Sequence, residues 1–166
     1  MRKTLVLGFT TAIAAAATLL IAGPGGAAVT GCKTGMTTYG GANARTFCGT
    51  AHASVRAGGK GFTIRGGLCQ NNGGSVTVDI GEIVLGASAK PKPEYFGLTV
   101  GRAAVGTGPV AAKDGFYHSA IVAVVHGGKG YPLRANATVV LSHGRSRGTF
   151  SATSLDGGTV TGSFAC

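Results

Sequence analysis

Four cysteines carry most of the chemistry that this chain of 166 residues could perform: Cys32, Cys48, Cys69 and Cys166. A cysteine can form a disulfide, ligate a metal or accept a lipid, and its neighbours decide which. No CxxC pair and no Cys/His spacing typical of zinc occurs, so we expect no metal site. The stretch Val29-Thr30-Gly31-Cys32 follows the small-residue pattern that precedes the acylated cysteine of a bacterial lipoprotein. It predicts lipidation of Cys32.

The same boundary has a second interpretation, in which the protein is released. An ordinary signal peptidase would cut after Ala28, with small Gly26 and Ala28 at the two positions that it inspects. Cys32 could then form a disulfide with Cys48, whereas lipidation of Cys32 leaves one cysteine unpaired. We expect lipidation, which anchors the protein to the extracellular face of the cell membrane, and keep secretion as the alternative.

A disulfide between Cys69 and Cys166 is expected in both cases. Both cysteines lie in or beside strand-like segments, and Cys166 is the last residue of the chain. The bridge would close a loop of roughly a hundred residues, for which chain entropy predicts a stabilisation of about 4–5 kcal/mol. It would fix the final strand.

The segment before the cysteines predicts export. Arg2 and Lys3 precede an uncharged, Leu/Ala-rich run over residues 5–22, which ends at a glycine-proline cluster. This order is typical of a secretory signal peptide, which we place at residues 1–31. A transmembrane helix is the weaker interpretation, because the run is at the short limit of about 18 residues for a span. Export implies an oxidising compartment, in which disulfides persist.

One short pattern resembles a hydrolase motif. Gly144-Arg145-Ser146-Arg147-Gly148 matches GxSxG, in which the serine lies on a turn between a strand and a helix. Here the following residues alternate as a strand does, so we interpret Ser146 as a turn residue between two strands. The motif therefore gives no catalytic site.

The other titratable residues do not group. The four histidines, His52, His118, His126 and His143, lie apart in the sequence, and a turn at residues 127–130 would place His126 opposite Tyr131. The five acidic residues are scattered too, so we expect no catalytic carboxylate pair. We expect no enzyme activity, no cofactor and no metal.

The charge is strongly basic. The net charge of +10 falls to +8 when the signal peptide takes Arg2 and Lys3 with it. In an exported protein this charge favours attraction to anionic lipid head groups or anionic envelope polymers. We nevertheless expect a solvated basic surface rather than a specific anion site. Nucleic acid is not expected, because the basic residues are dispersed and no aromatic residues alternate with them to form a base-stacking surface.

Strand periodicity dominates the mature chain. Residues 32–50 are rich in Gly, Thr and Ala without a sustained period, and we expect a flexible tether there. Residues 51–166 form one β domain, since the mature chain of about 135 residues suffices for one core. Its alternating segments are separated by glycine-rich turns. The expected strands lie near residues 51–55, 62–65, 75–80, 95–100, 116–125, 139–141, 149–152 and 160–164.

These segments predict an all-β fold, an antiparallel sandwich or barrel of about eight strands. The run over residues 116–125 is nearly all apolar and β-branched at its centre. It predicts a central strand covered on both faces. A glycine pair, Gly66 and Gly67, precedes Cys69, where a bulge would turn the cysteine toward the inner face.

Several segments carry a resemblance to a known family. They are Phe62-Thr63-Ile64, Gly67-Leu68-Cys69, and residues 75–81 (SVTVDIG), 95–101 (YFGLTVG) and 159–166 (TVTGSFAC). Together they resemble the mycobacterial lipoprotein antigen family of the nineteen-kilodalton type, over residues 51–166. The resemblance implies an exported, commonly lipid-anchored and antigenic surface protein with an all-β body. The chain differs from that family in carrying Cys48 and a shorter tether.

The sequence therefore predicts a cell-envelope surface protein without catalytic activity, held by a lipid on Cys32. The alternative is a secreted, soluble β-rich binding module, such as a protease inhibitor that inserts the loop at residues 89–94 into its partner. Two disulfides would favour the secreted module, and an acylated Cys32 would favour the anchored antigen.

Overall fold

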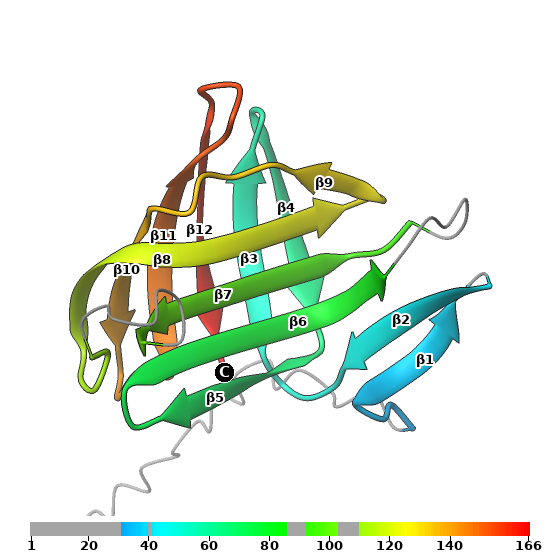
Figure 1. The fold of residues 1–166 in the computed structure, drawn as a ribbon, viewed down its shortest axis with the longest axis horizontal. Coiled ribbons are helices and arrows are strands. Elements are labelled where there is room, and N and C mark those ends of the chain that lie inside the picture. The colour runs from blue at the N-terminus through cyan, green and yellow to red at the C-terminus, as the bar shows by residue number, and fades with distance from the viewer. Residues whose placement is uncertain (1–30, 40, 86–91, 103–109) are drawn as a thin grey trace, which may run out of the picture.

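A computed structural model describes residues 31–39, 41–85, 92–102 and 110–166. The expected signal peptide at residues 1–31 lies outside the described residues except for its last position. No helix within the described ranges is long and apolar enough to cross a membrane. The described chain is all-β and antiparallel, as predicted (Figure 1).

Twelve strands are present in the described residues, more than the eight expected. The additional strands lie at residues 35–39, 42–47, 67–72 and 129–131, where apolar alternation is weak. The strands are β1 (Gly35–Tyr39), β2 (Ala42–Phe47), β3 (His52–Ala57), β4 (Lys60–Arg65), β5 (Gly67–Asn72), β6 (Ser75–Leu85), β7 (Tyr95–Gly101), β8 (Gly115–His126), β9 (Lys129–Tyr131), β10 (Ala137–Ser142), β11 (Arg147–Thr153) and β12 (Thr159–Ala165).

The strands form two layers that share β8. The hydrogen-bonded order is β1-β2-β6-β7-β8-β10-β11-β12-β3-β4, with β5 also on β6 and β9 also on β8. We call the layer from β10 to β4 sheet B and the layer from β1 to β7, with β5 and β9, sheet A. Figure 1 shows β6, β7 and β8 crossing in front of the strands of sheet B. The arrangement is that of a sandwich whose corners are made by strands passing between layers.

A bulge in β8 makes the first corner. Its first half pairs with β10 and its second half with β7. Between Tyr117 and Ala120 the register shifts by one residue, and Ser119 adopts a left-handed φ of 61°. The shift keeps Tyr117 and Ala120 both buried although they are three residues apart. The extra residue bends the strand while its apolar side chains stay on the core side.

The glycine pair makes the second corner, between β4 and β5. Gly66 has a φ of +82°, and its carbonyl accepts a hydrogen bond from the amide of Gly81 (2.7 Å). Beyond it Cys69 packs against the core opposite fully buried Val78. The core-facing side chains thus change from even-numbered to odd-numbered positions between Ile64 and Cys69, as expected from the glycines.

Cross-strand aromatic residues fill the space between the layers. Phe164 lies on Gly148, and Phe150 lies on Gly162; a Cβ on either glycine would come within 2.7 Å of the ring. Phe150 in turn contacts Phe96 of sheet A, with ring centroids 5.1 Å apart. These inward-facing glycines let large rings lie against the sheet, which unites the two layers into one core.

The expected tether at residues 32–50 is wrong. This segment contains β1 and β2, which pair with each other and extend sheet A along β6. Ala44 is fully buried, and Thr46 donates a hydrogen bond to Glu82 (2.7 Å). Small residues and threonines suit an edge hairpin with one exposed face, whose weak apolar pattern resembles that of a linker. The β domain therefore begins before residue 51.

The expectation that β8 is covered on both faces is also wrong. Phe116 is 58% exposed and Ile121 is 41% exposed, both on the outer face. The inner face carries Tyr117, Ala120, Val122 and Val124, all buried. Because β8 has apolar residues on both faces, its sequence looks like that of a fully covered strand.

Candidate functional site

All four cysteines form disulfides, Cys32–Cys48 and Cys69–Cys166, with Cα–Cα distances of 5.8 and 5.7 Å. The second is the bridge predicted from the sequence. The first closes a loop around β1 and β2, where the amide of Cys48 donates to the hydroxyl of Thr34 (2.9 Å). A disulfide sulfur cannot carry a lipid thioether, so the structure departs from the lipidation expected at Cys32 and contains the Cys32–Cys48 disulfide of the alternative.

Ser146 lies in the turn between β10 and β11, as expected. Its hydroxyl donates a hydrogen bond to the backbone carbonyl of His143 (2.7 Å), and strand β11 follows directly. His143 and Arg145 both have positive φ. The carboxylate of Asp114 holds this turn by accepting hydrogen bonds from the amides of Gly144 (3.0 Å) and Arg145 (2.7 Å). The motif therefore has the geometry of a tight turn.

Replacing Ser146 by Ala should change little. The exposed hydrogen bond to His143 contributes about 0.5–1 kcal/mol at most, and no histidine ring nitrogen bonds the hydroxyl in the described residues. We expect the free energy of unfolding of the variant to lie within about 1 kcal/mol of that of the wild type. A fluorophosphonate probe should label neither protein. Labelling of the wild type alone would show an activated serine.

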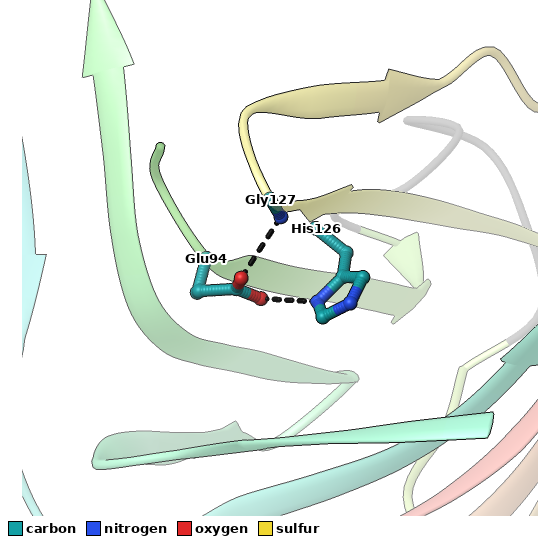
Figure 2. Close-up of polar contacts among 3 residues, drawn as sticks. All are labelled: Glu94, His126 and Gly127. Atoms are coloured by element: carbon teal, nitrogen blue, oxygen red, sulfur yellow. Dashed lines mark hydrogen bonds and ion pairs between the residues drawn. The ribbon is translucent and has the colours of Figure 1, made fainter. Parts of the chain in front are cut away.

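The most organised polar group is the pair formed by Glu94 and His126 (Figure 2). Glu94 directly precedes β7, and His126 ends β8. Nδ1 of His126 donates to one carboxylate oxygen (2.6 Å), and the amide of Gly127 donates to the other (2.8 Å). The amide of Gly128 also donates to the carbonyl of Pro93 (3.2 Å). These contacts fix the rotamer of the imidazole and leave its Nε2 as the acceptor when the ring is neutral.

An aromatic ring covers one face of this imidazole. The ring of Phe62, from β4 in sheet B, stacks on His126 with centroids 3.9 Å apart and planes 6° from parallel. Tyr131 lies beside Phe62 (6.0 Å), and the ammonium group of Lys129 lies over Tyr131 (5.8 Å). We call Phe62, Glu94, His126, Lys129 and Tyr131 the edge cluster. It joins the free edges of the two sheets.

The sequence did not reveal the edge cluster. Its members come from four separate segments, and only the layer packing brings Phe62 to His126. The expected position of His126 opposite Tyr131 is wrong, because His126 pairs with Lys129 and the turn contains only Gly127 and Gly128. The remaining signal was the glycine turn, which places His126 at a strand end.

Within the described residues, the edge cluster contains an oriented histidine but no nucleophile bonded to it. A histidine oriented by a carboxylate is two parts of a nucleophilic triad, and the third part would be a hydroxyl or thiol within hydrogen-bond reach. The described residues place no such bond at Nε2. Ser146 adjoins the opposite end of β8, on the order of 30 Å away along an extended strand. Within the described ranges no three His, Cys, Asp or Glu side chains gather to hold a metal.

A buried tyrosine lies on the outer face of sheet A. The hydroxyl of Tyr95 donates to the carboxylate of Asp79 (2.7 Å), and its ring covers Gly97. Phe47 packs beside it, with ring centroids 5.8 Å apart. Burial raises the pKa of Tyr95 far above its usual value, and the hydrogen bond and negative charge of Asp79 raise it further. The proton on Tyr95 is thus part of the folded structure.

This pKa shift predicts alkaline sensitivity. An unfolded tyrosine ionises near pH 10, and folded Tyr95 holds its proton to higher pH. Its contribution to stability is therefore complete below about pH 10 and falls as the pH rises further. We expect the ultraviolet difference absorbance at alkaline pH to show a tyrosine ionisation that coincides with unfolding. Tyr95→Phe should abolish this coupled step, and a coupled step that persists in the variant would contradict the assignment.

No protein-family model, curated protein or solved structure matches the chain. The similarity to the mycobacterial lipoprotein antigens therefore rests only on the residues quoted for it. The loop at residues 89–94, considered for insertion into a protease, lies outside the described residues up to residue 91.

Proposed function

We propose that the protein is an exported, non-catalytic β domain that binds anionic polymers of the cell envelope. The pairing of all four cysteines carries this proposal. Disulfides persist in oxidising compartments, in agreement with the signal peptide expected at residues 1–31. A compact body with two disulfides suits a domain that works outside the cell.

The Cys32–Cys48 bridge favours release over lipid anchoring. Lipidation and disulfide formation both consume the sulfur of Cys32, so one molecule can carry only one of them. We therefore propose the soluble binding module first. The lipid-anchored surface antigen is the second candidate, because Val29-Thr30-Gly31-Cys32 fits an acylation signal.

The charge pattern supports an anionic partner. The five carboxylates bind protein groups: Asp79 accepts from Tyr95, Glu82 from Thr46, Glu94 from His126, Asp114 from Gly144, and Asp156 from the amide of Gly158. Among the described residues, His126–Glu94 is the only ion pair. The lysines and arginines in these ranges thus form no ion pair with an acidic side chain, so their charge can attract an external anion.

The mass of the mature protein from its native host tests this proposal. We expect an unlipidated chain that begins at Val29, carries two disulfides and takes up no alkylating reagent before reduction. Cys32→Ser should then expose Cys48 to alkylation and leave the protein in the medium. In the anchored case the wild type is heavier and membrane-bound, and the same variant moves to the medium. That second outcome would overturn the soluble form.

A further inference from the structure

The outer face of sheet B is covered with hydroxyl groups. Strand alternation places Val55, Phe150 and Phe164 in the core, so their neighbours point to the opposite face. We call this surface the hydroxyl face. Its central hydroxyl residues are Ser54, Thr63, Thr149, Ser151, Thr161 and Ser163.

The strand register aligns these residues into a row. Thr63 pairs with Ser54, Ser54 with Ser163, and Ser163 with Thr149. The row continues through Val140 to Phe116, which are 43% and 58% exposed. It crosses six strands, and a strand spacing of roughly 4.8 Å gives a length of about 24 Å. One end of the row is polar and the other ends in an exposed aromatic ring.

Arginines flank the row on both sides. On each side of this row, the outward-facing residues two positions further along the strands form a parallel row. Arg56, which pairs with Thr161, lies in one of these neighbouring rows, and Arg65 and Arg147 lie in the other. His52 lies between the latter two, paired with Arg65. The five acidic residues of the chain all lie elsewhere: on β6, before β7, before β8 and in the β11–β12 turn. The hydroxyl face therefore carries positive charge without a compensating acidic side chain.

Two shallow depressions lie along the row. One, of about 380 Å³, is lined by Ser54, Arg56, Thr63 and Thr161, and the other, of about 450 Å³, by His52, Arg147 and Thr149. Ser54 and Ser163 line both, so the depressions adjoin. In the described part of the chain, the hydroxyls of Ser163 and Thr149 bond no protein group. An open trough with free donors suits an extended polymer better than an enclosed small molecule.

We propose that the hydroxyl face binds an acidic polysaccharide whose chain lies across the strands. The arginines form charge-assisted hydrogen bonds with the sugar carboxylates. The serine and threonine hydroxyls bind the sugar hydroxyls, and the ring of Phe116 packs against the apolar face of a sugar. This inference rests on the proposed function, and adds the polymer class and the surface that recognises it.

The composition of the face argues against other polyanions. Phe116 and the neighbouring His118 are in edge contact, with centroids 4.6 Å apart, and the hydroxyl rows contain no further aromatic ring. Binding of single-stranded nucleic acid relies on successive stacked bases, for which this face has too few rings. Insertion into a lipid surface needs an apolar face, whereas this face is dominated by hydroxyls.

Binding of the mature protein to polygalacturonate, a uronic-acid polymer, tests the inference by calorimetry at low and moderate salt. We expect the triple variant Arg56→Gln, Arg65→Gln, Arg147→Gln to weaken binding by roughly tenfold or more. The matched variant Lys33→Gln, Lys92→Gln, Lys113→Gln removes the same charge from exposed sites off the face and should weaken it by less than about threefold. Phe116→Ser should weaken binding by roughly fivefold without any change in charge.

The controls separate this inference from simple charge attraction. Neutral dextran, vesicles of phosphatidylglycerol and single-stranded DNA are compared with polygalacturonate, and thermal unfolding checks that each variant folds. Equal losses in the two triple variants, tighter binding to vesicles or DNA, or no binding by the wild type would each overturn the inference. The mass measurement of export and disulfides is independent, so a protein with two disulfides that fails to bind the polymer contradicts this inference alone.

Discussion

Removing the Cys69–Cys166 bridge should lower the free energy of unfolding by about 4–5 kcal/mol, the largest effect expected in this protein. The bridge closes a loop of 97 residues, which contains most of both sheets. Without it, the unfolded chain gains the conformations that the bridge excludes. Cys69 also packs against the core, so Cys69→Ala leaves a small void.

The other disulfide provides the matched control. Cys32–Cys48 spans 16 residues and encloses only the hairpin of β1 and β2. Its loss should loosen that edge hairpin, with an upper limit of about 3 kcal/mol from loop entropy. The remaining strands of sheets A and B keep their pairing, so the main unfolding transition should move much less.

Thermal and denaturant unfolding of the two double variants measures the difference. We expect Cys69→Ala with Cys166→Ser to lower Tm by roughly 10–20 °C. Cys32→Ser with Cys48→Ser should lower it by less than half as much. A smaller effect from the long-range bridge than from the short one would contradict the view that the bridge fixes β12 to the body of the domain.

Local patterns were sufficient to predict the class of fold. Alternation over residues 75–80 and 95–100 predicts β6 and β7, whose inner residues Val76, Val78 and Phe96 are fully buried. The glycine-rich turns expected between the strands include Gly73-Gly74, which joins β5 to β6 where Asn72 pairs with Ser75. Glycine turns and period-two patterns are short-range properties, and the sequence displays them directly.

The features that depend on distant packing were not predictable in this way. The bulge at Ser119 has no glycine or proline to mark it, yet it determines which side chains of β8 face the core. The hairpin of β1 and β2 has too few apolar residues to differ from a linker. The edge cluster and the hydroxyl face depend on the order of the strands in the sheets. Hydrophobic periodicity and turn residues do not determine that order.

Gly67→Ala should destabilise the domain by about 3 kcal/mol, because the new methyl group would meet backbone atoms. Gly67 begins β5, where the chain passes from sheet B to sheet A. A Cβ there would lie 2.3 Å from the carbonyl oxygen of Asp79 and 2.5 Å from Cα of Ile80. Neither atom can move unless β5 separates from β6, and this displacement would also carry Cys69 away from Val78.

Gly66→Asn is the matched control one residue earlier. The φ of +82° at Gly66 is one that asparagine tolerates, and a Cβ there would meet no atom within 4 Å. We expect a loss of less than about 1 kcal/mol in denaturant unfolding, with the yield of oxidised protein unchanged. Gly67→Ala should also lower that yield, because the corner positions Cys69 for its disulfide with Cys166. A greater loss of unfolding free energy in Gly66→Asn than in Gly67→Ala would contradict this view. It would mean that the backbone conformation of the corner, and not its close approach to β6, requires glycine there.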